Sequence, residues 1–328
     1  MIELDADAGT AAAAGETIVT VGTFDGVHRG HLDVLERLVA RARAAACPSL
    51  LVSFDPHPLE LLNPATAPRL LTTRQEKLAE LETTGLDQVA ILRFDRALAD
   101  LSADDFVDRI LRARFGMREL LIGHDHGFGR GREGSVETLR ALGASRGFLV
   151  EVVPPVCTAD GEAVSSSRIR RAIGAAQLDA AAEALGRPYS ASGVVAHGDA
   201  RGRLLGYPTL NVALDAPRKL LPPDGVYAVR VRTSRGEHGG MVNLGGRPTF
   251  GDESRTLEAH LFDATGDFYG DVARVHFVAR LRDIVRFDGP DALVAQLAAD
   301  ERTARRALTA SVEPGSLKGS MPFPPSTP

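Results

Sequence analysis

Two patterns of hydrophobic residues divide the chain near residue 184. In the first part, short apolar runs alternate with longer segments whose apolar residues recur every three or four positions. These patterns predict strands at 17–21, 49–54, 88–94, 119–123 and 148–153, and helices at 32–46, 74–83, 103–114 and 135–146. Apolar strands separated by helices are typical of a parallel sheet that is covered on both faces. A doubly wound α/β domain is therefore expected.

The second part has a different rhythm. After a helix predicted at 167–185, the segments are short, alternate between apolar and polar residues, and are joined by Gly, Pro and Asp turns. They predict strands within 192–198, 225–233, 239–246, 256–263 and 271–283, and one amphipathic helix at 291–308. This pattern favours an antiparallel barrel or sandwich. The predicted domains are an N-terminal extension (1–16), an α/β domain (17–184), a β domain (185–310) and a disordered tail (311–328).

Composition narrows the possible partners. The 328 residues are enough for about two domains, and 38 basic against 43 acidic residues give a net charge of -5. This balance argues against nucleic acid as a partner, although small anionic ligands remain possible. No signal peptide or membrane-length apolar run is found, so a cytoplasmic protein without a membrane partner is expected. Cys47 and Cys157 form no CxxC motif, and both are expected to be buried, reduced thiols.

A glycine-rich turn with two histidines is the first candidate site. In VGTFDGVHRGH (21–31), Gly22 and Gly26 allow a tight backbone course at the end of a strand. His28 and His31 then fall on one face of the first helical turn, beside unpaired backbone N–H groups. This arrangement predicts an anion site, whereas an ordinary helix start with surface histidines is the alternative.

The spacing in this turn matches neither GxGxxG nor GxxxxGK[ST]. The chain has only three lysines, and none lies in a glycine-rich turn. We therefore expect nucleotidyl transfer, in which the two imidazoles stabilise charge on the transferred α-phosphate and Gly30 lets the phosphate approach. The segment VSSSRIRRAI (164–173), with hydroxyl caps and arginines, would bind the other phosphates, although alone it reads as a capped surface helix.

The β-rich half contains a second candidate site. HGDARGRLLGYPTLNV (197–212) has glycines and arginines that suit phosphates, and Thr209 and Asn211 offer hard oxygen ligands for Mg²⁺ that carries ATP. In TLEAHLFD (256–263), Glu258 and His260 share one face of a predicted strand, where Glu258 can act as a general base. A plain turn and a half-buried strand are the alternatives for these two segments.

Twelve motifs together resemble a known family. TFDGVHRGH, SFDPHP, LLTTRQEKLAEL, LSADDFVDRIL, IGHDHGFGRGREG and SSSRIR resemble, in that order, the FMN adenylyltransferase module of the bifunctional bacterial riboflavin kinase/FAD synthetases. GDARGRLLGYPTLN, DGVYAV, VNLGGRPTF, LEAHLFD, FYGD and RFDGPDALVAQLAAD resemble its riboflavin kinase module, a six-stranded Greek-key barrel. The resemblance implies that ATP phosphorylates riboflavin to FMN and then adenylylates FMN to FAD, with release of pyrophosphate.

The resemblance also implies residue roles. His28, His31 and Glu258 would be catalytic. In the adenylyltransferase, ATP would contact Gly22, Phe24, Gly30, Asp125, Ser166, Ser167 and Arg170, and the flavin would contact Asp55, His57 and Phe128. In the kinase, ATP would contact Gly198, Arg201, Gly202, Gly206, Thr209 and Asn211, the last two also binding Mg²⁺.

The expected partners are small molecules alone, namely riboflavin, FMN and ATP, and the expected state is a monomer or transient homo-oligomer. Two other readings stay open. One is a nucleotidyltransferase with another acceptor and a regulatory barrel; the other is a protein that binds flavin or RNA without turnover.

Overall fold

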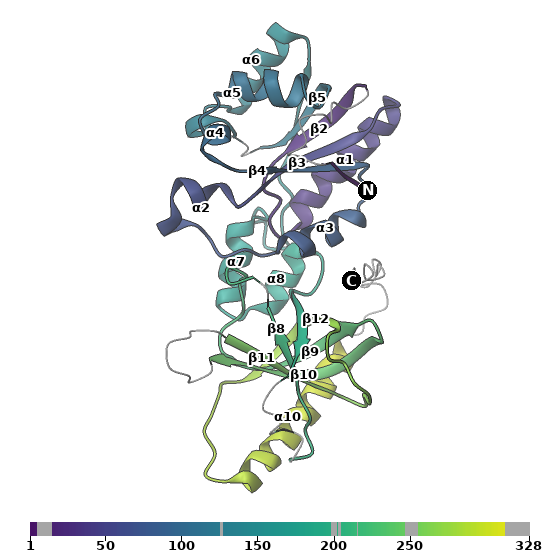
Figure 1. Ribbon diagram of the computed structural model, residues 1–328, viewed down its shortest axis with the longest axis vertical. Coiled ribbons are helices and arrows are strands. Elements are labelled where there is room, and N and C mark those ends of the chain that lie inside the picture. Colours follow the sequence, from purple (N-terminus) through teal and green to yellow (C-terminus); the bar gives the residue numbers. More distant parts are fainter. Residues whose placement is uncertain are drawn as a thin grey trace. The chain divides into compact units, whose positions relative to one another are not determined.

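The computed structural model describes residues 1–4, 15–124, 127–197, 202, 205–214, 216–246 and 255–311, without the side chains of residues 132 and 256. The chain divides into two compact units, Met1–Ser166 and Ser167–Pro328. The first holds a parallel sheet and the second holds a barrel. Each unit is drawn in Figure 1.

The first unit is built on a six-stranded sheet with the order β1-β4-β3-β2-β5-β6. Its strands are β1 (Ile2–Leu4), β2 (Thr17–Val21), β3 (Ser49–Asp55), β4 (Gln88–Arg93), β5 (Met117–Gly123) and β6 (Leu149–Val153). Every neighbouring pair is parallel. The chain winds outward from β2 to β4 and then returns to place β5 on the other side of β2. The sheet therefore switches direction between β2 and β5, where open α/β sheets bind ligands.

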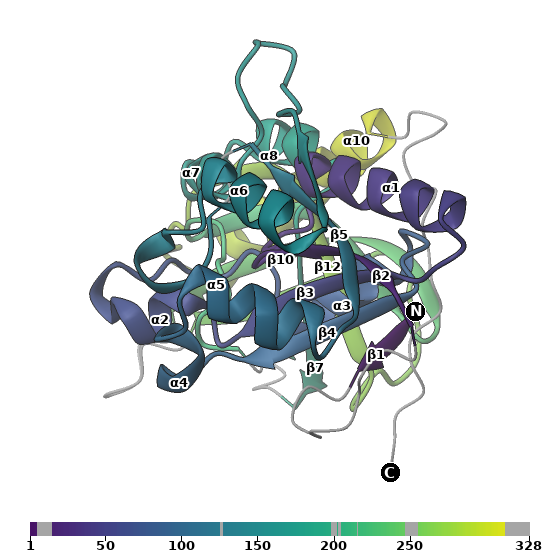
Figure 2. The ribbon, with the colours of Figure 1, turned by 90° about the horizontal axis from the view of Figure 1, so that it is seen from above.

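Helices cover both faces of this sheet, each over its own core (Figure 1 and Figure 2). On one face, α1 (Arg29–Ala44) and α3 (Arg74–Glu82) contribute Leu35, Leu38 and Leu81, all fully buried. On the other, a π-helix (Phe106–Arg112) and α6 (Val136–Arg146) contribute Leu111 and Leu139. The predicted doubly wound domain is therefore confirmed.

Some local elements of the first unit differ from the pattern. The helix predicted at 103–114 begins as α5 (Ala103–Asp105) but continues as the π-helix, which hydrophobic periodicity does not distinguish from an α-helix. Strand β1 was not predicted, because it is three residues long and pairs only with β4 at the sheet edge. The short elements α2 (Pro58–Leu62), η1 (Pro64–Thr66), α4 (Arg96–Ala99) and η3 (Arg130–Arg132) were also not predicted.

The second unit contains a closed barrel with the order β10-β11-β8-β7-β12-β9. Its strands are β7 (Ser190–Ala196), β8 (Leu210–Ala213), β9 (Gly225–Thr233), β10 (Gly236–Gly246), β11 (Arg255–Leu261) and β12 (Val272–Arg282). All six pairings are antiparallel. Closure removes exposed sheet edges, and it decides between the predicted barrel and sandwich in favour of the barrel.

Helix α10 (Pro290–Ala310) packs on the outside of the barrel (Figure 1). Its Ala304 and Leu308 join Ala228 of β9 and Met241 of β10 in a small buried cluster. Inside the barrel, Tyr227 and Phe277 are among the largest fully buried side chains of the described residues. The barrel thus has an inner core of its own and a second core under α10. Helix α10 corresponds to the amphipathic helix predicted at 291–308.

Three predictions for the second unit need correction or lie outside the described residues. The helix predicted at 167–185 is two helices, α7 (Ser166–Gly174) and α8 (Leu178–Leu185), because the backbone takes a positive φ of 56° at Ala176. Strand β8 was not among the predicted strands, since Pro208 and a four-residue length hide its alternation. The predicted disordered tail falls almost wholly on residues 312–328, outside the described residues.

Two further observations concern the whole chain. Cys157 is exposed and Cys47 is half-buried, so the expectation of two buried thiols is wrong. Cys157 lies in the hairpin-like segment where it pairs with Ala163, which leaves it at the surface. Among the described residues, no helix has the length and apolarity needed to cross a membrane.

Candidate functional sites

The turn between β2 and α1 is strained, and it lies at the switch point of the sheet. Phe24 and Val27 have φ values of 46° and 40°, a region that side chains other than glycine rarely occupy, and Gly26 has φ 88°. Phe24 and Val27 are nevertheless buried, at 4% and 0% exposure, so packing holds the strained backbone in place. Strain of this kind is concentrated at functional sites.

The two histidines of this turn meet at the first turn of α1. His28 is the N-cap, and its Nδ1 accepts a hydrogen bond from the backbone N–H of His31 at 3.3 Å. The two rings stack with centroids 3.6 Å apart, and the Phe24 ring lies 4.5 Å from that of His31. Because Nδ1 of His28 is an acceptor, a neutral ring carries its proton on Nε2. A Cβ at Gly30 would lie 3.3 Å from the His28 ring, so glycine leaves room for this stack.

The buried carboxylate of Asp25 anchors the turn between β2 and α1 to the segment that precedes α3. Asp25 is 2% exposed, and its oxygens accept hydrogen bonds from the backbone N–H groups of Leu71 and Thr72, each at 3.0 Å. The Thr72 hydroxyl also receives the N–H of Gly26 at 3.0 Å. On the other side, Ser166 Oγ donates to the carbonyl of Asp25 at 2.9 Å. Ser166 is thus hydrogen-bonded directly to the turn of residues 21–31, which we call the histidine turn.

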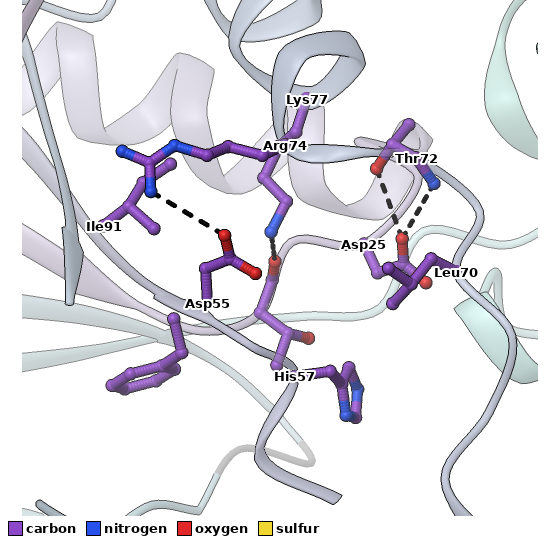
Figure 3. Close-up of a pocket in the computed structure, with 10 residues that line it drawn as sticks. Asp25, Asp55, His57, Leu70, Thr72, Arg74, Lys77 and Ile91 are labelled. Carbon is purple, nitrogen blue, oxygen red and sulfur yellow. Dashed lines mark hydrogen bonds and ion pairs between the residues drawn. The ribbon is translucent and has the colours of Figure 1, made fainter. Parts of the chain in front are cut away.

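Next to the turn, a pocket is lined by charged, polar and apolar side chains (Figure 3). Its lining residues are Thr23, Asp25, Phe54, Asp55, His57, Leu70, Thr72, Arg74, Lys77 and Ile91. Figure 3 shows Lys77 reaching down between Asp55 and Asp25. The mixture of an aromatic ring, aliphatic side chains and a few convergent polar groups is typical of small-molecule sites.

Lys77 was not predicted as a site residue. It is 8% exposed, and its Nζ donates to the carbonyl of Thr23 at 2.7 Å and lies 3.4 Å from Ser53 Oγ. Burial lowers the pKa of Lys77, while the nearby carboxylates of Asp25 and Asp55 oppose that shift. The sequence offered only the rarity of lysine as a signal. Its place beside the turn depends on packing between α3 and β3.

Asp55 and His57 both reach the pocket. Asp55 forms an ion pair with Arg74, Oδ2 to Nη1 at 3.7 Å. His57 caps α2, where its Nδ1 accepts from the N–H of Leu59 at 3.2 Å and its own N–H donates to Glu60 at 3.3 Å. The pocket therefore contains two of the three residues that were predicted to contact flavin.

The third, Phe128, lies elsewhere. It is 8% exposed in the core and packs on Phe106, with ring centroids 5.0 Å apart. Its predicted flavin contact stays a prediction. Asp125 falls outside the described residues. Ser167 and Arg170 lie in α7, within the second compact unit.

In the barrel, three polar residues form a row across neighbouring strands. Glu258 of β11 lies directly opposite Asn211 of β8 on one side and Asn243 of β10 on the other. Leu257 and Ala259, which flank Glu258, are buried in the barrel, so Glu258 points to the outer face. The register brings Glu258 and Asn211 together, although the two are 47 positions apart in the chain.

The segment before β8 is held against β11 by a residue whose role was not predicted. Nδ1 of His260 lies 2.8 Å from the carbonyl oxygen of Pro208, and the ring packs on Tyr207. The backbone of Gly202 approaches Tyr207 so closely that a Cβ at residue 202 would lie 2.2 Å from the Tyr207 carbonyl oxygen. These contacts fix the position of Thr209. Gly206 has φ 80°, while Gly198 and Arg201 fall outside the described residues.

The donors of this site fit a hard cation. Thr209 and Asn211 are both half-buried and supply a hydroxyl and an amide oxygen, which are ligand types that Mg²⁺ accepts. The neighbouring Glu258 adds negative charge beside them. When bound, Mg²⁺ would neutralise charge on the phosphates of ATP.

Comparison with known proteins places both units in one family. A family model described as FAD synthetase matches residues 10–168, and one described as riboflavin kinase matches residues 185–308. The bifunctional riboflavin kinase/FMN adenylyltransferase of Pseudomonas fluorescens is 43% identical over 88% of this chain and 92% of its own length. The chain belongs to this bifunctional family. It is an enzyme of flavin cofactor biosynthesis, with a riboflavin kinase and an FMN adenylyltransferase activity.

Further relatives agree with this membership. The bifunctional enzyme of Escherichia coli K12 is 40% identical over 88% of this chain and 91% of its own length. A crystal structure named as a macrolide-efflux protein from Streptococcus pneumoniae shares the fold, with a TM-score of 0.83 and 32% identity over 93% of this chain and 98% of that one. Family membership excludes the regulatory-barrel reading and the reading without turnover.

Proposed function

We propose that the histidine turn of the first unit is the FMN adenylyltransferase site. The observation that carries this assignment is the stack of His28 and His31 at the first turn of α1, above a strained turn at the switch point. Imidazole N–H groups and the helix N-terminus supply donors where charge develops on the transferred α-phosphate. Gly22, Phe24 and Gly30 shape the turn, and Ser166, bonded to Asp25, supports it. Ser167, Arg170 and Asp125 complete the proposed ATP contacts.

We propose that the pocket beside this turn receives the flavin of FMN. Asp55, His57 and Lys77 offer hydrogen-bonding groups, and Phe54 and Ile91 offer apolar surface to a flat ring. The chemical step is in-line: the phosphate oxygen of FMN attacks the α-phosphorus of ATP, and the bond to pyrophosphate breaks. The product is FAD.

We propose that the row on the outer face of the barrel is the riboflavin kinase site. Glu258 would accept the proton of the ribityl 5′-hydroxyl as its oxygen attacks the γ-phosphorus of ATP, and ADP would leave. Thr209 and Asn211 would hold Mg²⁺ with the nucleotide, and the loop that contains Gly198, Arg201, Gly202 and Gly206 would cover its phosphates. The register of Asn211 opposite Glu258 supports this assignment.

The functional domains that we propose are residues 17–184 and 185–310. The use of cellular ATP makes the cytoplasm the proposed location. The proposed partners are small molecules alone, with the chain acting as a monomer or a transient homo-oligomer.

One assay tests the proposal as a whole. Purified protein is incubated with riboflavin, ATP and Mg²⁺, and the flavins are resolved by chromatography. FMN should appear first and FAD second, and removal of Mg²⁺ with a chelator should stop FMN formation. Accumulation of FAD without a dependence on Mg²⁺ would contradict the proposed metal site.

Lys77→Met should lower adenylylation about tenfold and leave FMN formation unchanged. The Thr23 carbonyl would lose a charge-assisted hydrogen bond, a contact worth about 1.5–3 kcal/mol. Because Thr23 belongs to the histidine turn, the turn would be held less firmly. Initial rates of FAD formation from added FMN measure the effect.

Lys219→Met is the matched control, because Lys219 is also buried, at 3% exposure, but lies in the second unit. It should leave FAD formation from added FMN intact. An equal loss in both variants would show that Lys77 has no specific part in adenylylation.

A further inference from the structure

The backbone pairing between β8 and β11 ends just before the residue that would bind Mg²⁺. The last residue pair of this ladder joins Leu210 to Ala259. One position further on, the two chain segments carry Thr209 and His260. Pro208, the residue before Thr209, has no N–H with which to extend the ladder. The position of Thr209 therefore depends on contacts other than this backbone pairing.

His260 supplies one of these contacts. Its Nδ1 lies 2.8 Å from the carbonyl oxygen of Pro208, across 52 positions of the chain. Because a carbonyl oxygen can only accept a hydrogen bond, Nδ1 must carry the hydrogen. The bond joins β11 to the residue directly before Thr209.

Two aromatic rings hold the imidazole of His260 in this orientation. The ring of Tyr207 lies 5.0 Å from it at an interplanar angle of 61°, and the ring of Phe262 lies 5.8 Å from it at 66°. Phe262 is itself buried, in the cluster under α10. Edge-to-face contacts between aromatic rings favour a defined geometry. The contacts therefore keep Nδ1 directed at the Pro208 carbonyl.

The segment before Pro208 is hydrogen-bonded within its own loop. The N–H groups of Leu205 and Tyr207 donate to the carbonyl of Gly202 at 3.1 Å and 2.9 Å. A Cβ at Gly202 would lie 3.6 Å from Cγ2 of Thr209, so the loop backbone passes close to Thr209. The bond from His260 to Pro208 therefore attaches both this loop and Thr209 to β11.

We propose that His260 is a positioning residue of the kinase site, whose Nδ1–H fixes the Pro208 carbonyl and thereby sets Thr209 where Mg²⁺ would bind. The inference rests on the kinase site proposed above. Glu258 lies two residues before His260 in β11 and points to the same face. One strand thus carries the proposed general base and the group that positions the metal ligand relative to it.

The test compares two substitutions that both remove the imidazole ring. In His260→Asn, the amide nitrogen is bonded to Cγ, as Nδ1 is, and can still donate to the Pro208 carbonyl. In His260→Gln, the amide nitrogen lies one bond further out, at the place of Nε2, and this hydrogen bond is lost. His238→Gln in β10 is the control for the loss of a barrel histidine, and thermal unfolding checks that each variant is folded.

The first readout is hydrogen exchange of residues 205–211 in the ligand-free, full-length protein, followed by mass spectrometry. The Tyr207 amide exchanges only when its bond to Gly202 opens. Exchange in this segment should be roughly three- to tenfold faster in His260→Gln, because one hydrogen bond is lost. It should be unchanged in His260→Asn and in His238→Gln.

The second readout is the dependence of FMN formation on Mg²⁺. The Mg²⁺ concentration for a half-maximal rate should rise by a similar factor in His260→Gln alone, while kcat at saturating Mg²⁺ stays unchanged. Equal exchange in the Gln and Asn variants would overturn the proposal. A fall in kcat that added Mg²⁺ does not restore would overturn it as well.

Thr209→Val tests the metal site separately, because it removes the hydroxyl and keeps the shape of the side chain. It should raise the Mg²⁺ requirement without changing hydrogen exchange. An unchanged Mg²⁺ requirement would contradict the proposed metal site. Faster exchange in His260→Gln alone would still show in that case that His260 holds Pro208.

Discussion

His31→Ala is expected to lower FAD formation from added FMN by about a hundred- to a thousandfold, while the phosphorylation of riboflavin stays unchanged. Loss of one preorganised donor to a developing phosphate charge has an effect of this order. His31 is the better choice for this test than His28, because the His28 ring also caps α1. Substitution of His28 would remove this cap and lower the free energy of unfolding by about 1 kcal/mol. A loss of activity could then not be assigned to the phosphate contact alone.

The measurement compares kcat for FAD formation with kcat for FMN formation in the same preparation. Thermal unfolding checks that the variant is folded. His238→Ala is the matched control, because His238 lies in β10 of the barrel, where it packs on Phe268. A loss of less than tenfold in His31→Ala, or a parallel loss of FMN formation, would rule out the proposed role.

Glu258→Gln is expected to lower the riboflavin kinase rate by roughly a hundred- to ten-thousandfold, which is the usual contribution of a general base. The amide keeps the size of the side chain and its position opposite Asn211 and Asn243, but it cannot accept the proton of the hydroxyl. FMN that is added directly should still become FAD at the normal rate.

Asp263→Asn serves as the control for this variant. Asp263 lies just after β11, the strand that carries Glu258, and its side chain is 77% exposed and forms an ion pair with Arg305. It should leave both activities unchanged. If Glu258→Gln abolished adenylylation as well, the two reactions would not use separate sites. If it left FMN formation intact, the general base would be another group.

Long, regular segments of the fold could be predicted from the sequence, whereas short and interrupted ones could not. β2, β3 and α3 follow from apolar runs and a capping box, in which Thr73 and Glu76 bond to each other's backbone. The break between α7 and α8 depends on one residue with positive φ, Ala176, within an alanine-rich run whose periodicity predicts a single helix. Strand β8 forms because β7 and β11 supply partners on both sides.

The sites show the same division. His28 and His31 could be placed together because three positions along a helix bring side chains onto one face. Lys77 could not be placed, since its contact with Thr23 spans 54 positions of the chain and arises from the packing of α3 against the sheet. Phe128 lies within the motif IGHDHGFGRGREG, and its packing on Phe106 depends on a long-range contact that the motif does not encode.

The sequence by itself determined the two-part organisation, the class of each part and the local chemistry of the histidine turn, because hydrophobic period and short spacing act within one element. The tertiary structure alone decided which distant groups meet: Lys77 under the turn, Glu258 between two asparagines, and His260 against Pro208. Strand register and helix packing determine which of these residues come into contact. Both depend on long-range contacts that no local pattern encodes.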